Sequence, residues 1–266
     1  EHPISWNPLE VQAALPVATI AAHLVSACKH IWRDSWGPRM EYVLTNMLHA
    51  LIEAECSLLS VPQFLTSKAF RVKIIARVHD PKVRHFFEHE FANFEPRLLS
   101  EIVSPIQNKI GQLLSHEAVR NVFARPHSSI DLRFIMDNRR ILLVNLAKGQ
   151  IGDEPANLFG SLLVSMIGAV ALARGVLPEA ERTPFFLYID EFQNFSTDRF
   201  SSMLSEVRKY ALGLVLAHQF VGQISDTIRQ AIFGNVATRI FFAVGSEDAQ
   251  ALSLEIAPYP PQYVQD

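Results

Sequence analysis

Two pairs of polar residues each follow a short apolar run, and their types suit chemistry on a phosphate. Asp190 and Glu191 end the stretch FFLYIDE, and His218 and Gln219 end LVLAHQ. An aspartate at the end of a buried strand can hold Mg²⁺ directly or through water. A glutamate beside it can activate a water molecule as a general base, and a glutamine can orient that water or sense the γ-phosphate. Taken alone, FFLYIDE also fits a strand that leaves the core at an acidic turn; the second motif favours a nucleotide site.

Arg208 lies between these two motifs, on the polar side of a predicted amphipathic helix over Arg199–Ala211. One interpretation is an ordinary solvated charged face. The other is an arginine finger that reaches the phosphate of a neighbouring subunit, where a permanently charged guanidinium stabilises developing negative charge. The sequence leaves both open.

The elements that must position these residues alternate between strands and helices. Short apolar runs typical of buried strands occur at Ile141–Leu146, Phe185–Ile189, Gly213–Ala217 and Thr238–Val244, and helices are predicted around Leu158–Ala173, Arg199–Ala211 and Gln223–Phe233. This order predicts an α/β fold with a mostly parallel sheet flanked by helices. Ligands bind such sheets at the carboxyl ends of the strands, so Asp190 and Gln219 are expected to face one crevice.

The segment Leu158–Ala173 is apolar or small on every side. As a helix it is about 24 Å long, shorter than the ~30 Å hydrocarbon layer of a membrane. We therefore expect a helix buried within the fold rather than a membrane span.

The first half of the chain reads as helical between about Arg39 and Arg125, with no strand pattern of any strength. The predicted organisation is an N-terminal segment of the core at 1–38, an all-α domain at 39–126, and the main α/β core at 127–266.

Composition excludes several classes of protein. The 266 residues are 49% hydrophobic and 19% charged, which fits a globular protein and excludes disorder. The net charge of −3 excludes a broadly basic surface, so any contact with nucleic acid must be local. Two cysteines, Cys28 and Cys56, indicate a reducing compartment rather than a secreted disulfide scaffold.

Three C-terminal stretches resemble the conjugative coupling ATPases of type IV secretion, within the HerA–FtsK-like group of DNA translocases. They are Phe185–Phe195, Ser205–Gln219 and Phe233–Ser253, with supporting likeness at Ser5–Glu10, Trp36–Leu44 and Ser129–Gly152. The resemblance implies a RecA-like ATPase core with Asp190 and Glu191 as the Walker B pair. It also implies Gln219 as the motif III glutamine, Arg208 as an arginine acting in trans, and an inserted all-α domain.

The resemblance further implies ATP and Mg²⁺ as cofactors, a homo-hexamer, and DNA passing through a central pore. Type IV secretion or relaxosome proteins would be its partners. The expected location is cytoplasmic, with any inner-membrane anchor in N-terminal sequence outside these residues.

One departure from that family concerns the phosphate-binding loop. No G-x-x-x-x-G-K-[ST] motif occurs in the chain, so the cradle of backbone N–H groups and its lysine are missing. In the family this loop precedes the region where this chain begins, and its strand is central in the sheet. We therefore expect these residues alone to lack ATPase activity and to expose unpaired strand edges.

Other interpretations remain open. A degenerate ATPase-like scaffold could dock partners through its helical block. His85 and His89, in an H-x-x-E-H pattern, could bind zinc but lack an evident third ligand. Lys148 could touch phosphate or simply end a strand. The basic run Arg71–Arg84 could contact DNA, although a solvated face is the simpler reading.

Overall fold

The computed structural model describes residues 4–13 and 15–253. The ends of the first and third predicted segments, residues 1–3 and 254–266, lie outside this range. The described part is mostly helical and contains one two-stranded parallel sheet. The predicted helices are confirmed, whereas the RecA-like sheet appears only as this pair of strands.

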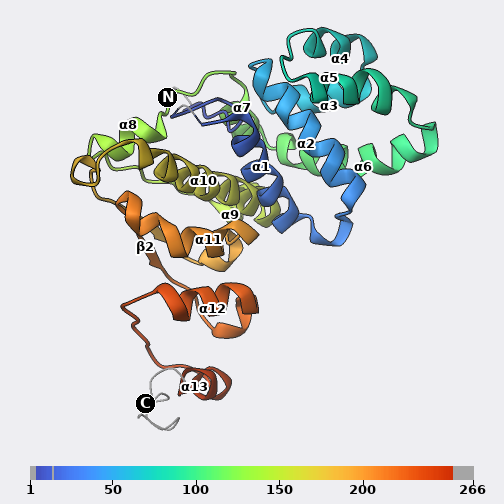
Figure 1. Ribbon diagram of the computed structural model, residues 1–266. Coiled ribbons are helices and arrows are strands. Elements are labelled where there is room, and N and C mark those ends of the chain that lie inside the picture. The colour runs from blue at the N-terminus through green and yellow to red at the C-terminus, as the bar shows by residue number, and fades with distance from the viewer. Residues whose placement is uncertain (1–3, 14, 254–266) are drawn as a thin grey trace.

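The first half is an assembly of helices (Figure 1). After α1 (Val17–Ile31), it comprises α2 (Pro38–Glu53), α3 (Ser60–Thr66), α4 (Lys68–Ile75), α5 (Pro81–His85), the π-helix η2 (Phe86–Glu90), α6 (Pro96–Ser115) and α7 (Glu117–Phe123). The local sequence determines where several of these helices begin. Pro38 and Pro81 occupy first-turn positions, where a missing N–H costs nothing, and the Asp80 carboxylate accepts hydrogen bonds from the first amides of α5.

The second half begins with α8 (Leu132–Asp137) and the short α9 (Lys148–Ile151), which lead into α10 (Asp153–Ala173). It continues through β1 (Phe185–Ile189), α11 (Asp198–Glu206), the 3₁₀ helix η7 (Val207–Tyr210), β2 (Leu212–Leu216), α12 (Asp226–Asn235) and α13 (Ser246–Ser253). Helix α12 packs against α11, and Figure 1 shows α13 beyond it, at the end of the chain that is farthest from the helical first half.

Helix α10 is the centre of the core and packs against α1, α8 and α11. Among the described residues it is the one helix long and apolar enough to cross a membrane by length and composition. Most of it is buried, including Leu162, Met166 and Val170. The prediction of a buried helix over Leu158–Ala173 is confirmed, and packing accounts for its apolar composition.

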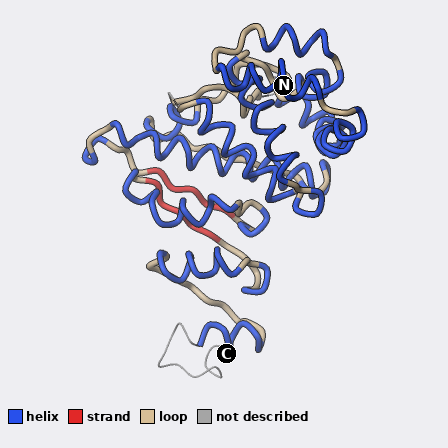
Figure 2. Tube along the Cα trace, turned by 45° about the vertical axis from the view of Figure 1, so that its right-hand side comes forward, coloured by secondary structure: helices blue, strands red, loops and turns tan. Residues whose placement is uncertain are grey.

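The two strands pair in parallel from Phe185↔Leu212 to Ile189↔Leu216, and Figure 2 shows them as the two red segments. One sheet face, with Leu187 and Ile189, packs against the core. The other face is open, with Phe186 and Tyr188 exposed. The Phe186 ring lies over Gly213, where a Cβ would come within 2.6 Å of it. The sheet is therefore covered on one side only.

Two predicted strands, Ile141–Leu146 and Thr238–Val244, are wrong for this structure. Both segments are irregular, and Ile141, Leu143 and Phe242 are 88%, 90% and 84% exposed. A strand requires a neighbour that completes its hydrogen bonds. Within the described residues, β1 and β2 pair only with each other. The apolar composition indicates burial, but no element here covers these segments.

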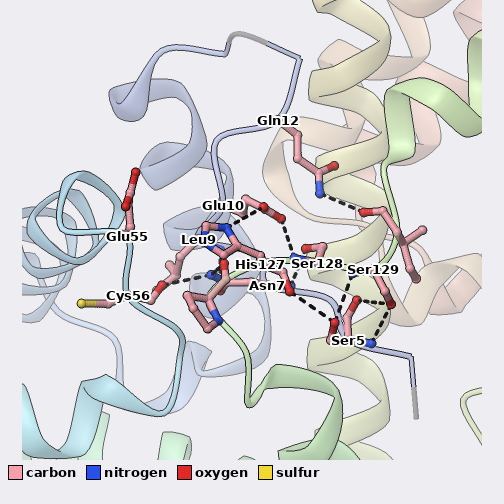
Figure 3. Close-up of polar contacts among 12 residues, drawn as sticks. Ser5, Asn7, Leu9, Glu10, Gln12, Glu55, Cys56, His127, Ser128 and Ser129 are labelled. Atoms are coloured by element: carbon pink, nitrogen blue, oxygen red, sulfur yellow. Dashed lines mark hydrogen bonds and ion pairs between the residues drawn. The ribbon is translucent and has the colours of Figure 1, made fainter. Parts of the chain in front are cut away.

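A network of hydrogen bonds ties the N-terminal segment to residues 126–130, where the chain leaves the helical block (Figure 3). Ser129 N donates to Ser5 O (2.9 Å), and Ser128 N donates to Glu10 Oε2 (2.8 Å). Gln12 Nε2 donates to the carbonyl of Ile130 (3.2 Å). These bonds connect segments more than a hundred residues apart, so they fix where the block joins the core.

Asn7 is the buried centre of this network. Its Nδ2 donates to the carbonyls of Cys56 (3.0 Å) and Pro126 (2.7 Å), and its Oδ1 accepts from Leu9 N (3.2 Å). The side chain is only 2% exposed. One amide therefore holds two points of the helical block to the N-terminal segment.

We expect Asn7→Ala to lower the free energy of unfolding by about 2–3 kcal/mol, because it leaves buried carbonyl and amide groups unpaired. Urea denaturation of the two proteins measures this difference. Asn93→Ala removes an exposed amide that bonds within its own turn, and should change stability by less than about 0.5 kcal/mol. Equal effects of the two substitutions would contradict the role given to Asn7.

Candidate functional site

The carboxyl ends of β1 and β2 lie side by side, and the hydrogen-bond ladder extends past both strands. Ala217 N donates to Ile189 O (2.9 Å), and Phe192 N donates to Ala217 O (3.1 Å). The loops after the two strands are therefore held at a fixed spacing. This brings the polar residues of both motifs to the same edge of the sheet.

Glu191 is the residue on which the two loops converge. Its backbone is left-handed, with φ of 49°, which turns the chain sharply after the strand. Its Oε1 accepts a hydrogen bond from Gln219 Nε2 (2.8 Å), and its Oε2 accepts one from Gln193 Nε2 (2.6 Å). The structure thus joins Glu191 and Gln219 directly. Gln193 was not singled out from the sequence.

The surroundings of Glu191 favour its ionised form. The hydrogen bonds from Gln193 and Gln219 lower the pKa of this carboxyl below its usual value, and the charges of Lys148 and His218 act in the same direction. The side chain therefore stays negatively charged near neutral pH, and the two hydrogen bonds fix its orientation. A carboxylate in this state can accept a proton from a bound water.

Asp190 is exposed at the end of β1, and its Oδ1 accepts a hydrogen bond from Glu191 N (3.0 Å). No group of three or more His, Cys, Asp or Glu side chains that could hold a metal exists in the described part of the chain. A single carboxylate nevertheless fits Mg²⁺, which usually takes one or two protein carboxylates and completes its shell with water and phosphate oxygens.

Helix α10 supports the loop that follows β1. A Cβ on Gly160 would come within 2.4 Å of the Phe195 ring and 2.9 Å of Leu146, so only glycine lets both side chains approach the helix this closely. Lys148 Nζ lies 5.8 Å from the centre of the same Phe195 ring. This packing brings a cation from the segment before α10 close to the sheet edge that carries Glu191.

Arg208 lies elsewhere. It is exposed in η7, immediately before β2, whereas Gln219 follows that strand. The five residues of β2 separate them by roughly 16 Å at the usual rise per strand residue. Within one chain Arg208 therefore lies at the opposite end of the strand from Glu191. Its action in trans stays a prediction.

The other candidate motifs of the sequence form no comparable site in the part of the chain that the structure describes. The rings of His85 and His89 lie 4.7 Å apart on the exposed side of α5 and η2, with no third ligand grouped beside them in the described part of the chain. In the basic run, Arg71 stacks on the Phe91 ring at 4.8 Å and donates to the carbonyl of Phe64. That arginine is engaged in holding the helices together.

The comparison with protein families concerns the same region. Residues 184–258 match the family model TraG-D_C, described as the TraM recognition site of TraD and TraG. No curated protein and no solved structure matches the chain. TraD and TraG are conjugative coupling proteins, and TraM is a relaxosome protein. The match supports a link to coupling proteins, conjugation and type IV secretion over the region that contains β1, α11, β2 and α12.

Proposed function

We propose that this chain provides the water-activating half of an ATP-driven, DNA-translocating motor of the coupling-protein type. The observation that carries the proposal is the contact between Glu191 and Gln219 at the shared edge of β1 and β2. Glu191 acts as the general base, Gln219 orients the attacking water, and Asp190 holds Mg²⁺. The family match over residues 184–258 supports the coupling-protein part of the proposal.

The proposed reaction is the hydrolysis of the bond between the β- and γ-phosphates of ATP. Glu191 takes a proton from a water molecule held by Gln219, and the water oxygen forms a bond to the γ-phosphorus. The bond from that phosphorus to the bridging oxygen breaks, and ADP leaves with the electron pair. A bound Mg²⁺ would neutralise charge on the phosphate oxygens, and Asp190 is the residue here with the exposed carboxylate to hold it.

Arg208 would act on a neighbouring subunit. Its place at the far end of β2 prevents it from reaching the Glu191 edge of its own chain. In the proposed homo-hexamer, the guanidinium would contact the γ-phosphate held by the adjacent copy and stabilise the transition-state charge. DNA would pass through the central pore by contacts with its backbone. The proposed location is cytoplasmic.

The open side of the sheet is an argument that a phosphate-binding loop is contributed by sequence outside these 266 residues. Phe186 and Tyr188 on the sheet, and Ile141 and Leu143 in the irregular segment before α9, are more exposed than large apolar side chains usually are. A further strand pairing with β1 or β2 and its connecting segments would bury them. Such a strand could bring the phosphate-binding loop to the carboxyl edge of the sheet.

The family match also favours partner recognition. In TraD and TraG the matched region recognises TraM. We propose that residues 184–258 dock a relaxosome protein here as well, which is compatible with the motor. A scaffold that docks partners without hydrolysing ATP is the alternative.

An ATPase assay on two proteins tests the proposal. We expect no steady-state turnover by the 266-residue chain, and Mg²⁺-dependent turnover by a chain extended to include a G-x-x-x-x-G-K-[ST] loop, because the γ-phosphate needs that cradle. Robust turnover by the 266 residues alone would refute the proposal that the site needs a phosphate-binding loop from outside them. Absence of turnover in the extended, folded chain would favour the scaffold.

A further inference from the structure

A cavity lies where α1, α10 and α11 meet, the three helices that pack together in the middle of Figure 1. Its volume is about 80 Å³. None of Asp190, Glu191 or Gln219 lines it, so it is separate from the edge of the sheet described above. Its walls combine apolar side chains with several polar ones, and the arrangement of the polar groups points to a ligand.

His23 of α1 is the buried polar group of this cavity. It is 7% exposed, and its Nδ1 atom has no hydrogen-bond partner in the described part of the chain. Burial, together with the charge of Arg199, lowers the pKa of His23 to about 4. The ring is therefore neutral near pH 7, with one N–H to donate and one nitrogen to accept. Buried polar atoms without a partner are rare in folded proteins, which indicates a missing acceptor or donor.

Arg199 of α11 supplies positive charge to the same cavity. Its side chain is exposed at the opening and forms no ion pair with any residue that the structure describes. The hydroxyl-bearing residues Thr197, Ser202 and Ser165 line the cavity beside it. The cavity therefore offers a guanidinium, an imidazole and hydroxyl groups as donors.

Glu206 is the one acidic residue in the lining. It follows Arg199 by seven positions on α11, and the helix rise places the two about 10 Å apart along the axis. Arg199 therefore lies near the start of α11 and Glu206 at its end. An anion beside Arg199 would meet attraction from its charge and little repulsion from Glu206.

We propose that this cavity binds a compact oxyanion, held by the guanidinium of Arg199 and by the N–H of His23. The volume holds two or three water molecules at about 30 Å³ each, or one phosphate-sized group. Arginine binds carboxylate and phosphate oxygens through paired, charge-assisted hydrogen bonds. The ligand group would also give His23 Nδ1 the partner that it lacks among the described residues. This site does not depend on the proposed ATPase activity.

Calorimetric titration of the 266-residue chain with inorganic phosphate, and separately with acetate, tests the proposal at constant ionic strength. We expect binding of at least one of the two anions and a loss of about tenfold or more in affinity for Arg199→Gln, the usual effect of removing a charge-assisted bond. Arg39→Gln removes an exposed arginine of α2 and should leave binding unchanged. Phosphate binding alone indicates a phosphoryl ligand, and acetate binding alone indicates a carboxylate ligand.

NMR of the imidazole nitrogens locates the bound anion. Titration with the anion should shift the His23 signals and leave those of the exposed His89 in place. Three results would overturn the proposal: no binding of either anion up to about 10 mM, a range that corresponds to negligible affinity; equal affinity of Arg199→Gln and the unmodified chain; or unmoved His23 signals at saturation.

Discussion

Glu191→Gln, made in a chain extended to include a phosphate-binding loop, is expected to lower kcat for ATP hydrolysis by about 10²–10⁴-fold, the usual contribution of a general base. Glutamine keeps the size of the side chain, and its oxygen can still accept from one of the amides of Gln193 and Gln219; the other amide must turn over to accept from the new NH₂ group. It cannot take the proton of the attacking water. The affinity for ATP should change little, so a kcat effect without a matching loss of nucleotide binding is the expected signature.

Glu179→Gln is the matched control. Glu179 is exposed in the 3₁₀ helix that precedes β1, and the substitution removes the same charge without touching the sheet edge. Steady-state kinetics of the three proteins, together with fluorescence titration of a nucleotide analogue, separate a loss of turnover from a loss of nucleotide affinity. Turnover by Glu191→Gln within a few-fold of the unmodified enzyme would exclude Glu191 as the base.

Acid is expected to destabilise the protein in part through His23. Its pKa is about 4 in the folded chain and 6.5 ordinarily, so between these pH values the unfolded chain binds the proton and the folded chain does not. This contribution to stability is complete above pH 6.5 and is lost as the pH falls toward 4. The difference in pKa corresponds to about 3 kcal/mol at about 1.36 kcal/mol per unit.

Urea denaturation from pH 7 to pH 4, in a buffer without phosphate, measures this contribution. His23→Gln cannot titrate, so the unmodified protein should lose about 3 kcal/mol more than this variant over the same range. His89→Gln removes an exposed histidine and should lose as much as the unmodified protein. An NMR titration that gives His23 a pKa near 6.5 in the folded chain would contradict the expectation, whatever the variants show.

Apolar composition located the sheet only where a partner strand is present. The runs FFLYI and GLVLA indicated strands, and β1 and β2 pair in parallel close to those bounds. The run ILLVNL is similarly apolar yet forms no strand, because nothing in the described residues pairs with it. A sequence shows that a segment can be buried on both faces, but its partners decide whether it becomes a strand.

The part of the candidate site that could be predicted from the sequence is the part whose position depends on the order of the strands. Residues that follow two neighbouring parallel strands share an edge, and Glu191 and Gln219 are in contact there. Gln193 had no such signal, since its reach to Glu191 depends on the left-handed turn that Glu191 itself adopts. The division into segments 1–38, 39–126 and 127–266 and the roles given to the site residues stay predictions.

His23 shows a further limit of the sequence. Ten histidines are spread along the chain, and most read as surface residues. His23 lies within the apolar helix α1, where Leu24, Val25 and Cys28 are also buried. Its helical position alone does not show that α11 would bring Arg199 beside it. That proximity arises only when the three helices pack.

The proposed roles of Asp190, Glu191 and Gln219 are tested most directly by a structure of the extended chain bound to a non-hydrolysable ATP analogue and Mg²⁺. We expect Asp190 to hold Mg²⁺ directly or through a water, and Glu191 and Gln219 to lie within hydrogen-bond reach of the water next to the γ-phosphate. A nucleotide bound away from the carboxyl edge of β1 and β2, with the Glu191 carboxylate still bonded only to Gln193 and Gln219, would contradict this assignment.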